Sequence, residues 1–403
     1  MDDRERACWV AFNRVPGIGV ARFRLLLERF GSLAAAWQAP PRDLAQAGLD
    51  RRALDALLAA RPQLRPEREL ERVGRLRAKV VTWHDAAYPP LLAAIPDPPP
   101  VLYVRGRLAA DQALAIVGTR RATLYGRDAA ERLAADLASA GLTIVSGLAK
   151  GIDTHAHRGA LKGGGRTIAV LGHGIDTCYP PENRRLAAEI AERGALVTDY
   201  AVGTGPLGEN FPPRNRIISG LAAGVLVVEA GETSGALITS RYAAEQGRDV
   251  FAVPGPITAH ASRGCHRLIQ DGAKLVTSAE DVLAELNPHL AVLSARQLRL
   301  EFAPSGATPS PSPLEGESGK WADPRGRGPG GVWGLNAAGR PDRPDGAPDS
   351  DLVARLRELG EAHVDLLARL SGRPVHEVSA ELTLLELQGR VRHLGGLRYT
   401  AAR

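Results

Sequence analysis

The chain has 403 residues, of which 44% are hydrophobic and 24% charged, and its net charge at pH 7 is +6. This composition excludes a wholly disordered chain, and about 150 residues per domain gives two to three domains. The charge excess lies in residues 1–110, whereas residues 111–290 carry 18 basic and 19 acidic side chains. Only five of the 51 basic residues are lysines, so an arginine-for-lysine bias explains the high pI as well as a nucleic-acid surface does.

Three cysteines, Cys8, Cys178 and Cys265, lie far apart with no CxxC pair. Neither a disulfide framework nor a cysteine zinc site is therefore expected. The first residues, MDDRERAC, lack the basic start and apolar stretch of a signal peptide, and no 18 apolar residues run together. We expect a cytoplasmic protein without a membrane span.

Residues 1–75 are predicted to form a helical domain. A turn containing Gly17 and Gly19 precedes an amphipathic helix that ends at Gly31. This spacing is typical of a helix-hairpin-helix or SAM-like domain, in which the Gly-x-Gly turn presents backbone N–H groups to a phosphate. Gly17 and Gly19 are candidate phosphate contacts, and a plain connection between helices is the alternative.

Residues 78–290 alternate short β-rich runs with amphipathic stretches. Strands are predicted over residues 113–117, 142–145, 167–171, 195–198, 225–228 and 249–253. Such alternation is typical of a parallel, doubly wound sheet and predicts an α/β, Rossmann-like core. Ligands of these folds bind beyond the carboxyl ends of the strands, so the segments after the strands are the candidate sites.

The first strand leads into Gly118, Arg120 and Arg121 and then a helix. Backbone N–H groups, a helix N-terminus and two guanidinium groups together suit an anion, although a solvated basic turn is the alternative. The second strand leads into Ser146, Gly147 and Lys150, with Asp153 or Thr154 as the expected N-cap of the next helix. This segment is not a Walker A loop, because it lacks the closing Gly-Lys-Ser/Thr.

The third strand is followed by a Gly-x-Gly sequence at residues 172–174, and the same segment continues to Thr177. A dinucleotide fingerprint would have a third glycine at position 177, so this segment is weak evidence for a nucleotide cofactor. We expect no cofactor.

An aromatic ring, two guanidinium groups and an amide stand together after the fourth strand, at Phe211, Arg214, Asn215 and Arg216. These groups can stack a base and hold its phosphates. The alternative places Phe211 in the core and pairs Arg214 with Glu229 or Asp199.

Residues 111–290 contain six aromatic side chains, of which Tyr125, Tyr179 and Phe211 fall in predicted strand-end segments rather than in strands. Packing alone would place aromatic residues in the strands. Basic and aromatic groups on one rim suit single-stranded nucleic acid better than a duplex, since bases must be unstacked to meet a ring.

Catalysis has little support in the sequence. Ser146 does not lie in a GxSxG elbow. His155 and His157 are two residues apart, a spacing that points them away from each other on a helix. We assign no catalytic residue and no metal site.

Residues 300–349 are predicted to be a flexible linker, since 19 of the 47 positions from 303 to 349 are Pro or Gly. Residues 350–403 are predicted to form three helices and a hairpin, which is a winged-helix domain. The third of these helices, predicted over 375–387, has an acidic first half without arginine. A partner-binding or regulatory role therefore fits at least as well as reading of the DNA major groove.

Five motifs follow one another in the central block: VGTR at 117–120, SGLAKGID at 146–153, TIAVLG at 167–172, FPPRNRII at 211–218 and VPG at 253–255. In this order they resemble the bacterial DNA-processing family DprA, also called Smf. The resemblance implies an extended Rossmann fold without enzymatic activity that acts as a homodimer, binds single-stranded DNA during natural transformation and helps to load the RecA recombinase.

Carried over by position, the resemblance implies a DNA pocket lined by Arg120, Lys150, Phe211, Arg214 and Asn215, with a floor shaped by Gly118, Ser146, Gly147 and Gly172. Ser234 and Gly235 are a further expected DNA contact. Two positions depart from the family pattern: Thr233 stands where a basic residue is frequent, and His266 where Asn is frequent. Two other functions remain open, namely a nucleotide-processing enzyme on a Rossmann-like sheet and a protein-docking scaffold.

Overall fold

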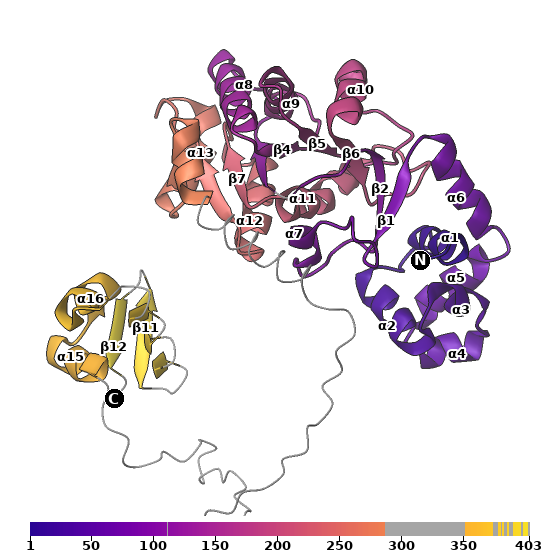
Figure 1. The fold of residues 1–403 in the computed structure, drawn as a ribbon, viewed down its shortest axis with the longest axis horizontal. Helices are drawn as coiled ribbons and strands as arrows, with labels where there is room; N and C mark the ends of the chain where they lie inside the picture. The colour runs from indigo at the N-terminus through magenta and orange to yellow at the C-terminus, as the bar shows by residue number, and fades with distance from the viewer. Residues whose placement is uncertain are drawn as a thin grey trace, which may run out of the picture. The chain divides into compact units, whose positions relative to one another are not determined.

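The computed structural model describes residues 1–110, 112–286 and 351–373, together with 378–379, 381–382, 385–386, 390–395 and 398–401. The chain divides into two compact units, Met1–Thr308 and Pro309–Arg403, which are described separately (Figure 1). The predicted linker over residues 300–349 lies outside the described residues.

Six helices form the N-terminal region of the first unit: α1 (Asp3–Asn13), α2 (Val20–Phe30), α3 (Leu33–Gln38), α4 (Pro41–Gln46), α5 (Arg51–Ala60) and α6 (Pro66–Arg75). Their ends follow from the local sequence. Ser32 and Asp50 cap α3 and α5 by accepting the N–H groups of Ala35 and Ala53. Gly31 ends α2 in the left-handed conformation, which a glycine adopts without strain.

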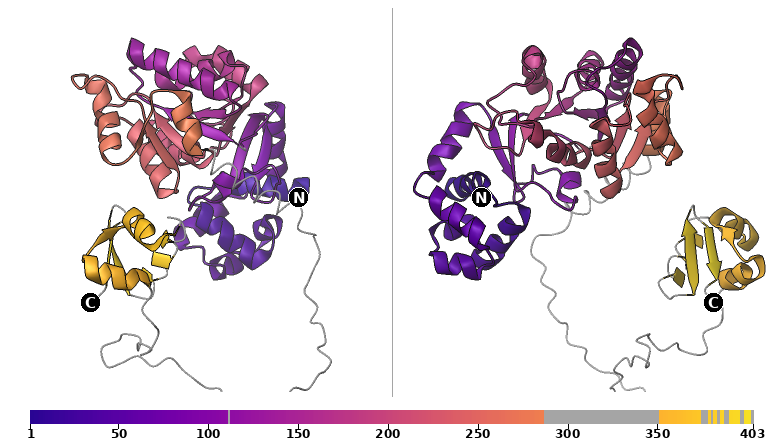
Figure 2. Two further views of the ribbon diagram at one scale, coloured as in Figure 1. Left: turned by 60° about the vertical axis from the view of Figure 1, so that its left-hand side comes forward. Right: turned by 180° about the vertical axis from the view of Figure 1, so that it is seen from behind.

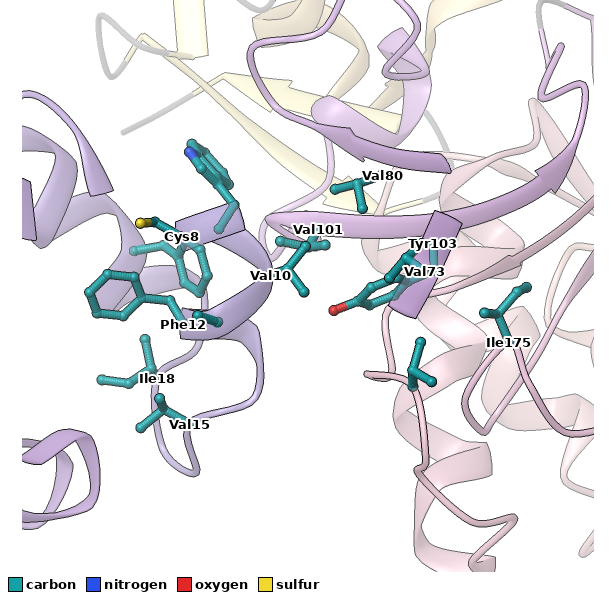
Figure 3. Close-up of a cluster of buried hydrophobic side chains, with 14 of the residues drawn as sticks. Cys8, Val10, Phe12, Val15, Ile18, Val73, Val80, Val101, Tyr103 and Ile175 are labelled. Atoms are coloured by element: carbon teal, nitrogen blue, oxygen red, sulfur yellow. The ribbon is translucent and has the colours of Figure 1, made fainter. Parts of the chain in front are cut away.

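The helical region shares a core with the edge of the sheet. Val10 and Phe12 of α1 belong to one buried cluster with Val101 and Tyr103 of the sheet (Figure 3). Trp9 is fully buried in the same cluster. Helices and sheet are therefore packed together through apolar contacts.

Nine strands form one sheet in the order β1-β2-β6-β5-β4-β3-β7-β8-β9. Their bounds are β1 (Lys79–Thr82), β2 (Val101–Gly106), β3 (Ala113–Val117), β4 (Thr143–Ser146), β5 (Thr167–Val170), β6 (Ala195–Thr198), β7 (Gly224–Val227), β8 (Asp249–Ala252) and β9 (Lys274–Leu275). The six predicted strands correspond to β3 through β8. From β6 to β9 all neighbours are parallel, whereas β1 and β2 extend the sheet with antiparallel pairings.

Helices cover both faces of this sheet, which explains why β3 to β7 are buried along their whole length. The helices are α7 (Pro90–Ala93), α8 (Leu124–Ser139), α9 (Ile152–Lys162), α10 (Arg184–Arg193), α11 (Phe211–Gly220), α12 (Ala236–Glu245) and α13 (Arg263–Gln270). One face carries α8 and α9, and the other carries α11 and α12 (Figures 1 and 2). In the described part of the chain, no helix combines the length and the apolar character that a membrane crossing requires.

The second unit contains α15 (Asp351–Leu359) and α16 (Val364–Ser371), with a three-stranded sheet of β10 (Ala362–His363), β11 (Val391–Gly395) and β12 (Arg398–Ala401). Its core includes Leu356, Leu367 and Tyr399. These helices and the β11–β12 pair agree with the expected winged-helix fold. Much of the third predicted helix, including residues 375–377, lies outside the described residues.

Candidate nucleic-acid interface

A cavity of about 510 Å³ lies at the carboxyl ends of the parallel strands. The chain runs from β3 through β4 and β5 to β6 on one side, and then places β7 on the other side of β3. This reversal opens a crevice between the segments that follow β3 and β7. Residues 118–121 and 233–236 from those two segments line the cavity, together with the start of α11.

Phe211, at the start of α11, has two guanidinium groups close to its ring. The guanidinium carbons of Arg120 and Arg214 lie 5.3 and 5.7 Å from the centroid of its ring, within the range of a cation–π contact. The ring of Tyr179 lies 5.9 Å away in a tilted arrangement. Phe211 is half-buried and Arg120 is exposed, so a ligand entering the cavity meets both an aromatic ring and a positive charge.

Arg214 is 3% exposed, and backbone carbonyl oxygens fix its guanidinium group. Its guanidinium donates to the carbonyl oxygens of Gly147, at 3.1 Å, and of Val170. Burial lowers the pKa of Arg214 to about 10, and the nearby carboxylate of Asp153 acts in the opposite direction. The side chain therefore stays charged at pH 7 and contributes a fixed positive charge to the cavity wall.

Asp153 does not cap the following helix, and neither does Thr154, so the expected N-cap is wrong. Gly151 is the N-cap residue of α9, with a φ of 80°, and a Cβ there would lie 2.3 Å from the carbonyl oxygen of Thr119. The Asp153 carboxylate instead accepts the N–H groups of the β4–α9 loop. Thr154 donates its hydroxyl to the carbonyl oxygen of Ala149. Asp153 thus lines the cavity and organises the loop beneath it.

Two glycines make room for the side chains at the cavity. A Cβ on Gly147 would lie 2.7 Å from Nη2 of Arg214, and a Cβ on Gly172 would lie 2.7 Å from the Phe211 ring. Both distances are shorter than a van der Waals contact, so these positions exclude larger residues unless Arg214 or Phe211 moves.

Gly118 lines the cavity, where a Cβ would lie 2.4 Å from the side chain of Ile152. Ser146 is fully buried, and its hydroxyl donates to the carbonyl oxygen of Ile116 at 2.6 Å. That hydrogen bond links β4 to β3, and Ser146 does not line the cavity. Ser146 therefore supports the loop rather than facing a ligand.

Lys150 and Tyr179 border a smaller cavity of about 50 Å³ that they share with Arg120 and Phe211. The Lys150 ammonium lies 2.6 Å from Oε1 of Glu182. This hydrogen-bonded carboxylate raises the pKa of Lys150. Lys150 thus lies beside the site but is paired with an acidic side chain.

Asn215, Arg121, Ser234 and Gly235 also line the larger cavity. The Asn215 amide oxygen accepts the Nε–H of Arg214 at 3.2 Å. Because that nitrogen can only donate, its partner must be the oxygen, and the amide NH₂ is the end left for a ligand.

Arg216 and Tyr125 do not line the cavity. The Arg216 guanidinium lies 2.8 Å from Asp97 and 3.0 Å from Asp199, so it is Arg216, not Arg214, that pairs with Asp199. The Tyr125 hydroxyl donates to the carbonyl oxygen of Pro254 at 2.7 Å. Neither residue shares the cavity with Phe211.

Gly17 and Gly19 lie in the turn between α1 and α2 and do not border this cavity. Gly17 has a φ of 82°, and its carbonyl oxygen accepts from Arg22, which also pairs with Asp50. The first turn of α2 is thereby tied to the N-cap of α5.

The cavity lining also includes residues that the sequence did not single out as DNA contacts, among them Thr233, Thr239 and His260. Thr239 lies within α12, and His260 follows a Pro-rich segment after β8. The position of Thr233 beside Ser234 was the signal available for it. For the other two, the sequence offered no pattern that would have distinguished them from structural residues.

Hydrogen bonds fix both ends of the segment from 199 to 210, which connects β6 to α11. Residues at the end of α1 bind its first part, and a hydrogen bond within the segment fixes its last residue. The Asn13 amide donates to the carbonyl oxygen of Asp199 at 2.9 Å, and Arg14 donates to that of Val202 at 2.7 Å. The Tyr200 hydroxyl donates to the carbonyl oxygen of Asn210, immediately before α11. The N-terminal helix thus contacts the segment that delivers Phe211.

Comparison with known proteins gives matches along most of the chain. Residues 79–287 match the family described as DNA recombination-mediator protein A, residues 336–396 a DprA winged helix domain, and residues 3–64 a DprA-like N-terminal HHH domain. These are the three parts of the expected fold.

Individual proteins and a solved structure that resemble this chain come from the same family as the matched domains. Protein Smf of Synechocystis is 36% identical over 412 residues, covering 99% of both chains. DNA processing protein DprA of Streptococcus pneumoniae is 50% identical over 203 residues, covering 50% of this chain and 72% of that protein. The X-ray structure of that protein matches at a TM-score of 0.62 and 38% identity, covering 71% of this chain and 98% of the other. The chain belongs to the DprA/Smf family of DNA processing proteins.

Proposed function

We propose that this protein binds single-stranded DNA in the cavity at the switch point of the sheet. The observation that carries the proposal is that the guanidinium groups of Arg120 and Arg214 lie only 5.3 and 5.7 Å from the centroid of the Phe211 ring. An aromatic face accepts any base, and adjacent guanidinium groups hold the phosphates on either side of it. These are the two requirements for binding a single strand without sequence preference.

The burial of the ring favours a single strand over a duplex. Phe211 is half-buried in a cavity, so a base reaches its face only after leaving the base stack. Arg214 is fixed by two carbonyl oxygens before any ligand arrives. A fixed donor loses little conformational entropy on binding, which favours affinity.

We further propose that the bound strand is passed to a RecA recombinase during natural transformation, and that the protein acts as a homodimer without catalysing a reaction. The description of the matched family as a recombination-mediator protein supports this partner. The roles of Arg120, Lys150, Phe211, Arg214 and Asn215 as DNA contacts are part of this proposal.

The test is a fluorescence anisotropy titration with a labelled oligothymidine and with a duplex of the same length. We expect strong preference for the single strand, and a loss of roughly tenfold or more in affinity for Phe211→Ala, from about 1–3 kcal/mol per stacked base. Arg120→Ala should weaken binding and reduce its salt dependence. Arg185→Ala is the matched control, because Arg185 is an exposed arginine on α10 that pairs with Glu189.

Equal affinity for single strand and duplex, or unchanged affinity in both Phe211→Ala and Arg120→Ala, contradicts the proposal. Nucleotides incubated with the protein provide a second readout. Saturable turnover of a free nucleotide would instead support the enzymatic alternative.

A further inference from the structure

Three large apolar side chains are exposed on two segments that also contribute residues to the cavity lining, and together they are called the apolar rim. Leu124 is 77% exposed, Tyr125 is 49% exposed and Ile257 is 87% exposed. Adjoining exposed apolar side chains in a folded protein indicate a surface that binds something.

The apolar rim comes from two segments that a hydrogen bond holds together. The Tyr125 hydroxyl, in the first turn of α8, donates to the carbonyl oxygen of Pro254 at 2.7 Å. Ile257 follows Pro254 by three residues. Both segments also line the cavity, through Arg121 before α8 and His260 after Ile257. The apolar rim is therefore continuous with the cavity wall along two separate stretches of backbone.

The start of α8 is firmly placed, so the exposure of its first two residues is built into the fold. Thr123 caps the helix by accepting the N–H of Gly126 at 3.1 Å. The buried carboxylate of Glu229 accepts both the hydroxyl and the N–H of Thr123, at 2.7 and 2.9 Å. This anchor orients the first turn and leaves Leu124 and Tyr125 exposed to solvent.

We propose that the apolar rim is a second base subsite for the strand that enters the cavity. This inference rests on the proposed function: one base lies against Phe211, the backbone passes the exposed guanidinium of Arg121, and the following bases lie on Tyr125 and Ile257. A tyrosine ring and an aliphatic side chain offer a flat apolar surface on which any base can stack. Arg121 lines the cavity and lies four residues before Tyr125, so its guanidinium supplies the phosphate contact on the path to the apolar rim.

The size and position of the apolar rim favour nucleotide bases over a protein partner. A stable protein interface covers roughly 800 Å² on each partner, which is more than three side chains supply. The adjoining cavity wall carries Arg121 and Arg120, both exposed, which suits a polyanion.

The experiment measures affinity for oligothymidines of increasing length with the full-length chain. The rim variant is the double substitution Tyr125→Ala and Ile257→Ser. Leu275→Ser is the matched control, because Leu275 is 44% exposed on β9 and borders neither the cavity of about 510 Å³ nor the smaller one beside Lys150. Tyr125→Phe keeps the ring but loses the hydroxyl that contacts Pro254.

The expected result is a length-dependent loss. Oligonucleotides short enough to fill only the cavity bind the rim variant as they bind the wild type, whereas longer ones lose roughly tenfold in affinity, the value of one stacked base. The Leu275→Ser control keeps the gain with length, and Tyr125→Phe retains most of it.

Three results overturn the inference. The gain with length could persist in the rim variant, affinity could fall equally at every length, or the rim variant could change its oligomeric state in sedimentation, which would make the apolar rim a protein interface. If the wild type binds short oligonucleotides through Phe211 and its affinity does not rise with length, the second subsite is contradicted but the proposed function is not. A wild type that binds no single strand sinks the proposed function itself.

Discussion

Arg214 and Asp153 hold opposite backbone groups of the same residue, Gly147. The guanidinium donates to the Gly147 carbonyl oxygen at 3.1 Å, while the carboxylate accepts the Gly147 N–H at 3.1 Å. Two buried charges of opposite sign are thus fixed around one peptide loop at the cavity. Burial raises the pKa of Asp153, and the positive charge of Arg214 opposes that rise.

Removing one of these charges should be costly. Arg214→Ala leaves the buried Asp153 carboxylate without its opposing charge, and we expect a loss of about 3–5 kcal/mol in the free energy of unfolding. Urea unfolding followed by tryptophan fluorescence measures it. Adding Asp153→Asn to Arg214→Ala should recover part of the stability, because the unopposed charge is removed. Additive losses in the double variant would show that the two charges are not coupled.

Gly172→Ala should weaken DNA binding, because the new methyl group would lie 2.7 Å from the Phe211 ring and displace it. We expect a loss approaching that of Phe211→Ala, roughly tenfold, in the anisotropy titration. Gly235→Ala is the matched control, since a Cβ there meets nothing within 4 Å although Gly235 also lines the cavity. Equal effects of the two substitutions would argue against displacement of the ring.

Glu182→Gln should strengthen binding at low ionic strength. Lys150 is paired with Glu182 at 2.6 Å, and neutralising the carboxylate frees the ammonium for a phosphate. Because both side chains are exposed and screened by salt, we expect an increase of only about twofold that disappears near 1 M salt. Glu189→Gln, which releases Arg185 on α10, serves as the control. An increase that persists at high salt contradicts this explanation.

Acid should destabilise the fold partly through His157. Burial lowers the pKa of this imidazole to about 3 from its usual 6.5, so the unfolded chain takes up a proton between these values while the folded chain does not. Stability is therefore present above pH 6.5 and falls as the pH drops toward 3, by at most about 1.4 kcal/mol per pH unit.

The Thr167 hydroxyl donates to the Ile144 carbonyl oxygen and must accept from Nδ1 of His157, at 2.7 Å. His157→Asn supplies a donor that does not titrate in this range. Urea midpoints measured from pH 7 to pH 4 should fall less steeply in this variant than in the wild type. Parallel curves would assign the acid sensitivity to other groups.

The position of the site could be predicted from the sequence, because parallel strands bring their carboxyl ends to one edge. That rule places Arg120, directly after β3, at this edge, whereas Phe211 reaches the same edge through the segment 199–210 that follows β6. The rule does not predict which of Arg214 and Arg216 lines the cavity. These residues are two apart on α11 and face different directions, and the acidic partners of Arg216 come from distant segments, at Asp97 and Asp199.

Strands β1 and β2 were not predicted either. The stretch between them contains the Pro-rich run 96–100, which obscures the pattern of a strand pair. β1 pairs with β2, and the pairing of β2 with β6 depends on tertiary contacts, since Tyr103 and Val101 of β2 pack in the cluster that contains α1. Local pattern carries little information about strands that form mainly through such contacts.

The hydrogen bonds from Asn13 and Arg14 tie the end of α1 to the segment that leads into α11 and Phe211. Shortening the chain from its N-terminus would remove the apolar contacts between α1 and β2 and would free this segment at Asp199 and Val202, and Phe211 lies at its far end. The helical region is therefore not a detachable accessory. Any homologue that lost it would need another anchor for the same loop to keep the ring in place.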